Sequence, residues 1–212
     1  MKTFLYYSDL KKPEVMITKI RERMIAQARV KGARIVGVAP REIPGFDVTV
    51  IQPAGKMPTA IFTAIMAGLD QIKEGTVYFC EDDVIYHDGH FELPHLSGEF
   101  TYDLNLVHLC PRGFFERHNR CSIALSHAWG ELDVVKKCIE RKIQEIKDNT
   151  FSCYEPAGSL GYPTGSRRAK FASIDVRHSN NNTWKVTTED RFTQHEEGWP
   201  SAAIMVKEFG IL

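Results

Sequence analysis

The chain has 212 residues, of which 43% are hydrophobic and 25% are charged, and this composition excludes an intrinsically disordered chain. Its 27 Lys and Arg residues balance its 27 Asp and Glu residues, so no overall positive field exists to attract nucleic acid. No apolar run reaches the roughly 20 residues of a membrane-spanning helix, and the N-terminus lacks the apolar core of a signal peptide. We therefore expect a cytoplasmic protein that forms a single domain.

The cysteines of this chain are few and scattered. There are five of them, and no two form a CxxC pair. A disulfide framework is not expected in a chain of this length, and a structural zinc site built on cysteine would need closer spacing. We expect reduced thiols.

The first part of the chain, from residue 1 to about residue 90, alternates between expected strands and helices. Short apolar segments predict strands at Phe4–Tyr7, Ala33–Val38, Val48–Ile51 and Thr76–Cys80. One helix opens at Pro13, where the missing N–H costs nothing, and ends at Gly32. A second helix opens at Pro58 after a glycine-containing loop. Apolar residues at helical spacing mark the buried faces of these helices: Ile17, Ile20, Met24 and Ala28 in the first, and Ile61, Ile65, Gly68, Leu69 and Ile72 in the second.

This alternation predicts the fold class. The segment Thr76–Cys80 is uninterruptedly apolar, which suits a strand covered by helices on both faces. Strand, helix, strand, strand, helix, strand is the order expected of an α/β protein with a mostly parallel sheet and right-handed crossovers. We therefore expect an α/β fold of the Rossmann-like kind in a single domain.

The second part of the chain is less regular. We expect strands at Tyr102–Leu109, Ser122–Ser126 and Phe171–Val176, and a helix from Glu131 to Asp148. The segment from Cys153 to Lys170 is rich in Gly, Pro and Ser, and this composition predicts a long loop.

Three consecutive carboxylates, Glu81, Asp82 and Asp83, directly follow the strand Thr76–Cys80. Like charges this close repel and raise one another's pKa unless a cation lies among them. In open α/β sheets the carboxyl ends of strands are also where ligands bind. An all-oxygen cluster suits Mg²⁺ or Mn²⁺, to which a diphosphate would add further oxygens. A solvated acidic turn is the alternative, and the local residues leave both interpretations open.

Two strings around these residues resemble a known group of proteins. FCEDDVIYHDGHF (Phe79 to Phe91) resembles the FCE-x-DV-x-YH string of small bacterial and phage glycosyltransferase-like proteins, and its Glu-x-Asp pattern is similar to the DxD signature of GT-A nucleotide-sugar glycosyltransferases. SIDVRHSNNNTW (Ser173 to Trp184) resembles the IDIRHG-x-N string of the same group. There are two departures: Ser179 replaces a glycine, and the variable middle position of the DxD pattern is itself acidic.

The resemblance implies a GT-A fold with a metal-dependent donor site. Residues 1–92 would form the half that binds the nucleotide sugar, and residues 93–212 the acceptor-side half that completes the metal site. Glu81 and Asp83 take the two acidic places of the DxD pattern and would bind Mn²⁺ or Mg²⁺. Many GT-A enzymes complete the metal site with a histidine near the C-terminus, and His178 would take that role.

The resemblance also implies which residues surround the donor. Tyr7, Ser8 and Asp9 would lie near the base and ribose, and Asp82 lies beside them in the acidic cluster. Lys56 precedes the helix that opens at Pro58, whose N-terminus would favour the diphosphate. A solvated loop lysine is the alternative for Lys56.

The implied reaction is the transfer of a sugar from a nucleotide-diphosphate sugar, with a UDP-sugar favoured, to an acceptor hydroxyl. Asp83 would act through the metal, which stabilises the leaving diphosphate. An inverting enzyme also needs a carboxylate base. The candidates are Asp103 and Glu155, whose alternative roles are those of an edge-strand acid and a turn residue. A retaining enzyme would need no separate base.

The acceptor is open between a glycan, or lipid-linked glycan, and a hydroxymethylated base in phage DNA. Basic residues gather in two stretches: Arg112, Arg117, His118 and Arg120 in one, and Arg167, Arg168 and Lys170 in the other. Such residues can follow a phosphate backbone. An ordinary solvated surface or a contact to the diphosphate is the favoured interpretation.

Other functions stay open at this point. A metal-dependent nuclease would use Glu81, Asp83 and His178 as ligands, and a non-catalytic module would bind the nucleotide sugar without turnover. A zinc hydrolase built on His87, His90 and His95 lacks an HExxH motif and is disfavoured. Neither a P-loop nor a GxGxxG fingerprint is present, which argues against the nucleotide-binding classes that depend on them.

Overall fold

The computed structural model describes residues 1–53, 55, 58–94, 96–115, 123–154, 164–177 and 191–211. The elements in chain order are β1 (Lys2–Tyr7), α1 (Glu14–Val30), β2 (Arg34–Ala39), β3 (Val48–Ile51), α2 (Thr59–Leu69), β4 (Thr76–Cys80), β5 (Val84–Ile85), the 3₁₀ helix η1 (Asp88–Glu92), β6 (Phe100–Asp103), β7 (Leu106–Cys110), β8 (Gly113–Phe115), the 3₁₀ helix η2 (Leu125–His127), β9 (Ala128–Glu131), α3 (Leu132–Lys147), β10 (Thr164–Arg167), β11 (Ser173–Val176), β12 (Phe192–Thr193) and α4 (Ala202–Phe209). Within these residues the strands form a seven-stranded sheet, in the order β10-β6-β9-β4-β1-β2-β3, and a five-stranded sheet, in the order β12-β8-β7-β11-β5.

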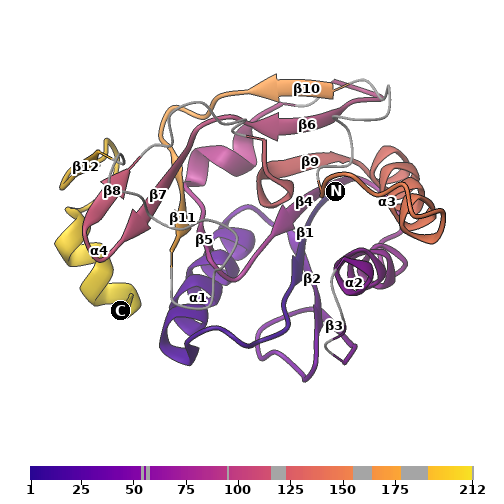
Figure 1. Ribbon diagram of the computed structural model, residues 1–212, viewed down its shortest axis with the longest axis horizontal. Coiled ribbons are helices and arrows are strands. Elements are labelled where there is room, and N and C mark those ends of the chain that lie inside the picture. The colour runs from indigo at the N-terminus through magenta and orange to yellow at the C-terminus, as the bar shows by residue number, and fades with distance from the viewer. Residues whose placement is uncertain are drawn as a thin grey trace.

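The seven-stranded sheet confirms the predicted α/β class. Strands β4, β1, β2 and β3 pair in parallel, β10 pairs in parallel with β6, and β9 is antiparallel to both of its neighbours. Strand β1 lies inside this sheet, between β4 and β2 (Figure 1). Its side chains alternate between two buried clusters, with Leu5 and Tyr7 on one face and Phe4 and Tyr6 on the other. A strand buried on both faces explains the uninterrupted apolar runs.

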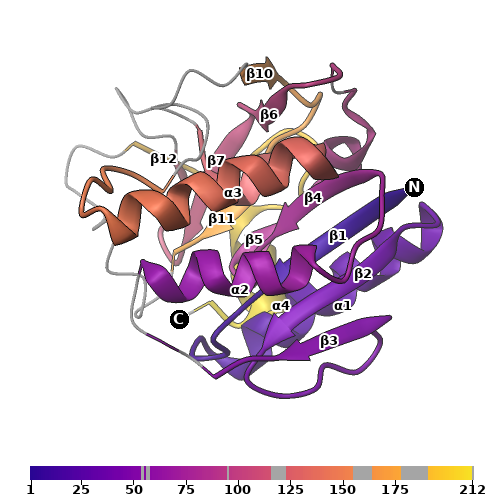
Figure 2. The ribbon, with the colours of Figure 1, turned by 90° about the vertical axis from the view of Figure 1, so that its right-hand side faces the viewer.

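Helices α2 and α3 cover one face of this sheet and lie side by side (Figure 2). A Cβ on Gly68 of α2 would lie 2.4 Å from Leu5 Cδ1 and 2.9 Å from Val38 Cγ2. The glycine therefore lets α2 approach the sheet closely. Ile65 and Leu69 are buried as predicted, but Phe62, which the predicted stripe omits, is also fully buried, and Ile61 is only partly buried.

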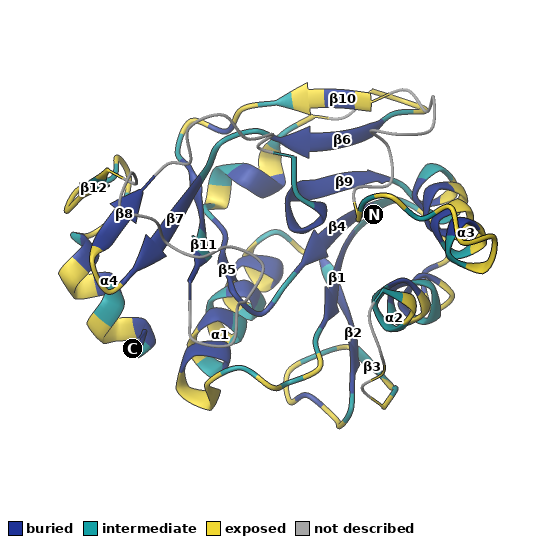
Figure 3. Ribbon diagram, in the orientation of Figure 1, coloured by how far each residue is buried: buried dark blue, intermediate teal, exposed yellow. Residues whose placement is uncertain are grey.

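Helix α1 lies on the opposite face and joins the two sheets. Met24 and Ala28 pack against the seven-stranded sheet, whereas Met16, Ile17 and Ile20 pack against the five-stranded sheet and α4. The central strands are dark blue in Figure 3, while the outward faces of the helices are exposed. Because α1 contributes to both cores, the protein is a single domain. In the described part of the chain, no helix is long and apolar enough to cross a membrane.

The second half of the chain departs from the predicted elements at several places. The predicted strand Tyr102–Leu109 is wrong as a single strand, because it divides into β6 and β7, which belong to different sheets. At the break, the Asn105 N–H donates to Asp103 Oδ1 (2.9 Å) and the Leu104 N–H donates to the Arg167 carbonyl (2.8 Å). These bonds turn the chain, and an apolar pattern does not reveal them.

Two further boundaries were predicted wrongly. In the segment Ser122–Ser126, residues 125 and 126 belong to η2, and the strand β9 begins only at Ala128. The loop predicted for Cys153 to Lys170 contains β10, an edge strand of polar and small residues (Thr164–Arg167). An edge strand with little apolar content carries no hydrophobic signal. The predicted helix from Glu131 to Asp148 is confirmed by α3 within one residue at each end.

Candidate functional site

The candidate site lies at the carboxyl ends of β1 and β4. Strands β2 and β3 follow on one side of β1 and β4 lies on its other side, so the strand order reverses between β1 and β4. Ligands bind at such a switch point in open α/β sheets. The parallel register pairs Tyr6 with Cys80. The residues that follow each strand, from Tyr7 and from Glu81 onward, therefore meet at one edge of the sheet.

Side chains from the end of β1 bond directly to the acidic cluster. The Tyr7 hydroxyl donates to Glu81 Oε1 at 2.5 Å. Ser8 Oγ donates to Asp82 Oδ2 and accepts the Leu10 N–H at 2.9 Å. The structure thus brings Tyr7 and Ser8, two of the predicted donor-binding residues, onto the carboxylates. These contacts hold the loop after β1 against the end of β4.

Lys12, which the sequence analysis did not single out, is the cation of this cluster. Its Nζ contacts Asp82 Oδ1 and lies 2.9 Å from Asp83 Oδ2. Only 21% of its side chain is exposed, against 67% for Lys11, which pairs with the exposed Asp9. The signal in the sequence that could have identified Lys12 is its place in a lysine pair, between the end of a strand and the proline that opens the next helix.

The pKa values in the cluster reflect burial and mutual repulsion. Burial and the neighbouring Asp83 raise the pKa of Glu81 to about 7. Burial also raises the pKa of Asp82, against the opposing effect of Lys12. Burial alone would lower the pKa of Lys12, but the carboxylates raise it above its usual range, so this ammonium stays charged at neutral pH.

The contacts pair the three acids differently from the DxD assignment. Asp82 and Asp83, rather than Glu81 and Asp83, converge on one cation. The backbone N–H of Glu81 donates to the Tyr86 hydroxyl, which in turn donates to the Ser126 carbonyl, both at 3.0 Å. In the protein without bound ligand, the middle residue of the triplet, Asp82, therefore pairs with Lys12 together with Asp83.

The donor set fits a hard divalent ion. Asp82 and Asp83 already share one cation, and Mg²⁺ is usually held by one or two carboxylates together with substrate phosphates. Among the residues that the structure describes, no group of three His, Cys, Asp or Glu side chains is placed to hold a metal. A diphosphate would therefore have to supply further oxygens. The Val176 N–H donates to the Asp83 carbonyl at 2.7 Å, so β11 ends beside the cluster. The predicted metal ligand His178 follows β11 in the chain but lies outside the described residues.

Of the two candidate bases, Asp103 lies in the core. It has no exposed surface, its Oδ2 lies 3.0 Å from His90 Nδ1, and its Oδ1 accepts the N–H groups of Asn105 and Ala169. Burial alone would raise its pKa, but these hydrogen bonds lower it. Such a carboxylate offers an acceptor no access, and we do not retain it as a base. Glu155 lies outside the described residues, as does Lys56.

Two histidines of the disfavoured zinc site, His87 and His90, have local partners. His87 Nδ1 accepts the Gly89 N–H at 3.2 Å and caps η1. His90 is completely buried beside Asp103, and His95 lies outside the described residues.

The structure describes only some residues of the two basic stretches. Arg168 and Lys170 are exposed and Arg167 is half-buried, whereas Arg112 lies over the Phe192 ring at 4.0 Å. Arg117, His118 and Arg120 lie outside the described residues.

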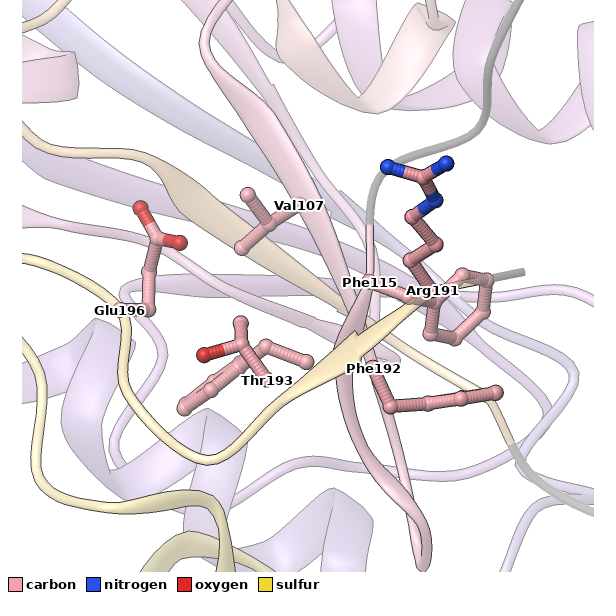
Figure 4. A pocket seen from close by; sticks show the side chains of 7 residues that line it. Val107, Phe115, Arg191, Phe192, Thr193 and Glu196 are labelled. Atoms are coloured by element: carbon pink, nitrogen blue, oxygen red, sulfur yellow. The ribbon is translucent and has the colours of Figure 1, made fainter.

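A separate pocket of about 260 Å³ lies on the five-stranded sheet. Figure 4 shows Glu196 on one side of it and Arg191 on the other. Its lining residues come from β7, β8, β12 and the segment around β12: Val107, Phe114, Phe115, Arg191, Phe192, Thr193 and Glu196. None of these residues belongs to the acidic cluster.

Comparisons with known proteins identify the fold. No protein-family model and no curated protein matches the chain. The inositol-1-phosphate CTP transferase from T. maritima is similar in structure, with a TM-score of 0.55 and 9% identity over 82% of this chain and 89% of that one. The 2-C-methyl-D-erythritol 4-phosphate cytidylyltransferase from Thermus thermophilus has a TM-score of 0.52 and 12% identity over 80% and 90%. A glycosyltransferase involved in glycosylation of the major capsid of PBCV-1 has a TM-score of 0.48 and 13% identity over 79% and 81%.

These identities show the fold alone. The chain has a mixed α/β, Rossmann-like fold with a mostly parallel central sheet and flanking helices. The predicted fold class is confirmed.

Proposed function

We propose that this chain is a glycosyltransferase that binds a nucleotide-diphosphate sugar, a UDP-sugar in the first instance, at the carboxyl ends of β1 and β4. One observation carries the proposal: the carboxylates of the FCEDDVIYH string lie at the switch point of the sheet, where Asp82 and Asp83 share a cation. Ligand binding at a switch point is a general property of open α/β sheets. The choice of a sugar donor rests on the sequence resemblance.

The proposed chemistry breaks the bond between the sugar and the diphosphate, so negative charge develops on the leaving nucleoside diphosphate. Mn²⁺ or Mg²⁺ bound to the acidic cluster would stabilise this charge as a Lewis acid. Asp82 and Asp83, which share the Lys12 ammonium, would hold the metal, Glu81 lies beside them, and Tyr7 and Ser8 fix the loop against which the nucleotide would lie.

The remaining parts of the site are proposals from the resemblance. His178 would complete the metal site, Lys56 would contact the diphosphate, and Asp9 would lie toward the ribose. Glu155 is the base that we retain for an inverting reaction. Residues 1–92 would serve the donor and residues 93–212 the acceptor, for which we propose a glycan or lipid-linked glycan hydroxyl ahead of a hydroxymethylated DNA base.

A second function, nucleotidyl transfer, has one observation in its favour. Two similar structures, each with a TM-score above 0.5, are a cytidylyltransferase and a CTP transferase. In that reaction the same cluster would face the triphosphate of a nucleotide, and the product would be pyrophosphate rather than a nucleoside diphosphate.

Product analysis tests the proposal. The purified protein is incubated with Mn²⁺ and a panel of UDP-, GDP- and CDP-sugars, with and without glycan acceptors, and separately with CTP or UTP and sugar phosphates. We expect a nucleoside diphosphate to be released from one nucleotide sugar, and we expect EDTA to abolish its release and binding of the donor. Undiminished donor binding in EDTA would refute metal dependence.

The other outcomes identify the alternatives. Pyrophosphate release would identify a nucleotidyltransferase. Donor binding without turnover would identify a binding module, and Mn²⁺-dependent cleavage of DNA a nuclease.

A further inference from the structure

We infer that Lys12 is an exchangeable cation of the donor site: it neutralises Asp82 and Asp83 in the free protein and moves to the diphosphate when metal and nucleotide bind together. This inference rests on the proposed function and adds to it a residue that the resemblance does not assign.

The position of Lys12 is specific to the acidic cluster. Its Nζ contacts a carboxylate oxygen of both Asp82 and Asp83, and the contact to Asp82 spans 70 positions of the chain. Its neighbour Lys11 has the same charge, but its side chain is 67% exposed and pairs with Asp9, outside the triplet. The two adjacent lysines thus differ in their exposure and in the carboxylates with which they pair.

A metal and the Lys12 ammonium compete for the same carboxylate oxygens. Two cations within a few ångströms of each other repel strongly in a partly buried site. A divalent ion on Asp82 and Asp83 would therefore displace Nζ, which would lose its partners.

Lys12 can move without disrupting the sheet. It lies in the loop between β1 and α1, not in a strand, and its side chain is long and flexible. Ser8 anchors this loop independently, through Asp82 and the Leu10 N–H. A diphosphate arriving with the metal would offer the displaced ammonium new anionic partners. Metal and nucleotide binding should therefore be coupled through Lys12, and the coupling must be reciprocal.

Three variants test this coupling: Lys12→Met removes the charge, Lys12→Arg keeps it, and Lys11→Met is the matched control. Binding of Mn²⁺ alone is measured by electron paramagnetic resonance, and binding of UDP at saturating Mn²⁺ by calorimetry. We expect Lys12→Met to bind Mn²⁺ alone about tenfold more tightly, because a nearby positive charge is gone. We expect it to bind UDP about tenfold more weakly, because a charged hydrogen-bond donor is lost.

Lys12→Arg and Lys11→Met should stay close to the wild type in both measurements. Opposite changes in the two affinities separate the proposed role from a purely structural one, which would weaken both. Loss of both affinities in Lys12→Met, or no change in either, would overturn the inference. Wild-type protein that binds no UDP at any Mn²⁺ concentration would instead refute the proposed function.

A structural measurement decides the question if Lys12→Met fails to fold. In a crystal structure of the wild type with Mn²⁺ and UDP, we expect Lys12 Nζ within hydrogen-bond distance of a phosphate oxygen. Nζ still bound to both Asp82 and Asp83 beside the bound UDP would overturn the inference.

Discussion

Asp82 and Asp83 are neighbours in the chain, but their surroundings give them different roles. Asp82 is 2% exposed and joins the loop after β1 to the end of β4 through Ser8 and Lys12. Asp83 also contacts Lys12, and its carbonyl accepts the Val176 N–H of β11. Replacing a carboxylate leaves that backbone contact intact. At the scale of single residues, Asp82 therefore has the larger part in stability.

This difference predicts separable effects of Asp82→Asn and Asp83→Asn. We expect Asp83→Asn to reduce turnover by about 100-fold or more, as loss of transition-state electrostatics does, with little change in melting temperature. Asp82→Asn should also lower turnover, because Asp82 shares the cation with Asp83, and should in addition cost about 1.5–3 kcal/mol of stability, the range for hydrogen bonds to charged groups. Thermal melts and initial rates of nucleoside diphosphate release measure both effects. Equal loss of turnover in two equally stable variants would contradict the assignment.

At the scale of elements, the local sequence pattern predicted the bounds of a helix or strand correctly where turn or capping residues lie on both sides of an apolar segment. Strand β3 has the predicted bounds, and α1 follows Pro13 and ends before Gly32, whose φ of +60° favours glycine. The division between β6 and β7 was missed because one of the hydrogen bonds at the break, from the Leu104 N–H to the Arg167 carbonyl, joins residues that are far apart in the chain. The packing of α2 also depends on how closely the helix approaches the sheet, because Gly68 faces Leu5 and Val38.

Gly68→Ala tests this close approach. Alanine is favoured over glycine in a helix by about 1 kcal/mol, but its Cβ would lie 2.4 Å from Leu5 Cδ1 and 2.9 Å from Val38 Cγ2. Both side chains are buried, so overpacking should outweigh propensity and cost about 1–3 kcal/mol net. Thr63→Ala, at an exposed position of the same helix, should change stability by less than about 0.5 kcal/mol. Urea denaturation measures both, and a Gly68→Ala variant as stable as the control would refute the packing argument.

At the scale of the whole molecule, the ring of His127 packs against that of Tyr86, which directly follows β5 of the five-stranded sheet. His127 precedes β9 of the seven-stranded sheet, is completely buried, and lies 3.0 Å, through Nδ1, from Ser126 Oγ. Burial and then the nearby His90 lower its pKa to about 3, against the opposing effects of Asp103 and of Asp175 from the five-stranded sheet. The folded protein thus holds a neutral, buried imidazole between β9 of the seven-stranded sheet and the residue that follows β5 of the five-stranded sheet.

From the lowered pKa of His127 we predict how the free energy of unfolding depends on pH. In the unfolded chain His127 has its ordinary pKa of about 6.5, so below that pH the unfolded state binds a proton that the folded state does not. Stability should be constant above about pH 6.5 and should fall as pH drops toward 3, by up to about 1.4 kcal/mol per pH unit from this group. We expect His127→Phe to have a shallower decline in urea denaturation between pH 6.5 and 4.5.

The exposed His195 provides the control. His195→Gln should keep the pH dependence of the wild type. An unchanged slope in His127→Phe would show that other groups produce the acid sensitivity.

The sequence by itself determined the α/β class, most elements of the first 80 residues or so, and the place of three carboxylates at the end of β4. These features are local: apolar runs, helix-opening prolines and terminal glycines act over a few neighbouring residues. Only the tertiary structure decided that Lys12 neutralises Asp82 and Asp83 and that Asp103 is buried against His90. The parallel pairing of β1 with β4 brings the lysine loop to carboxylates 70 positions away. Such a charge pair depends on how strands pair and not on local spacing, because the electrostatic energy follows distance in space.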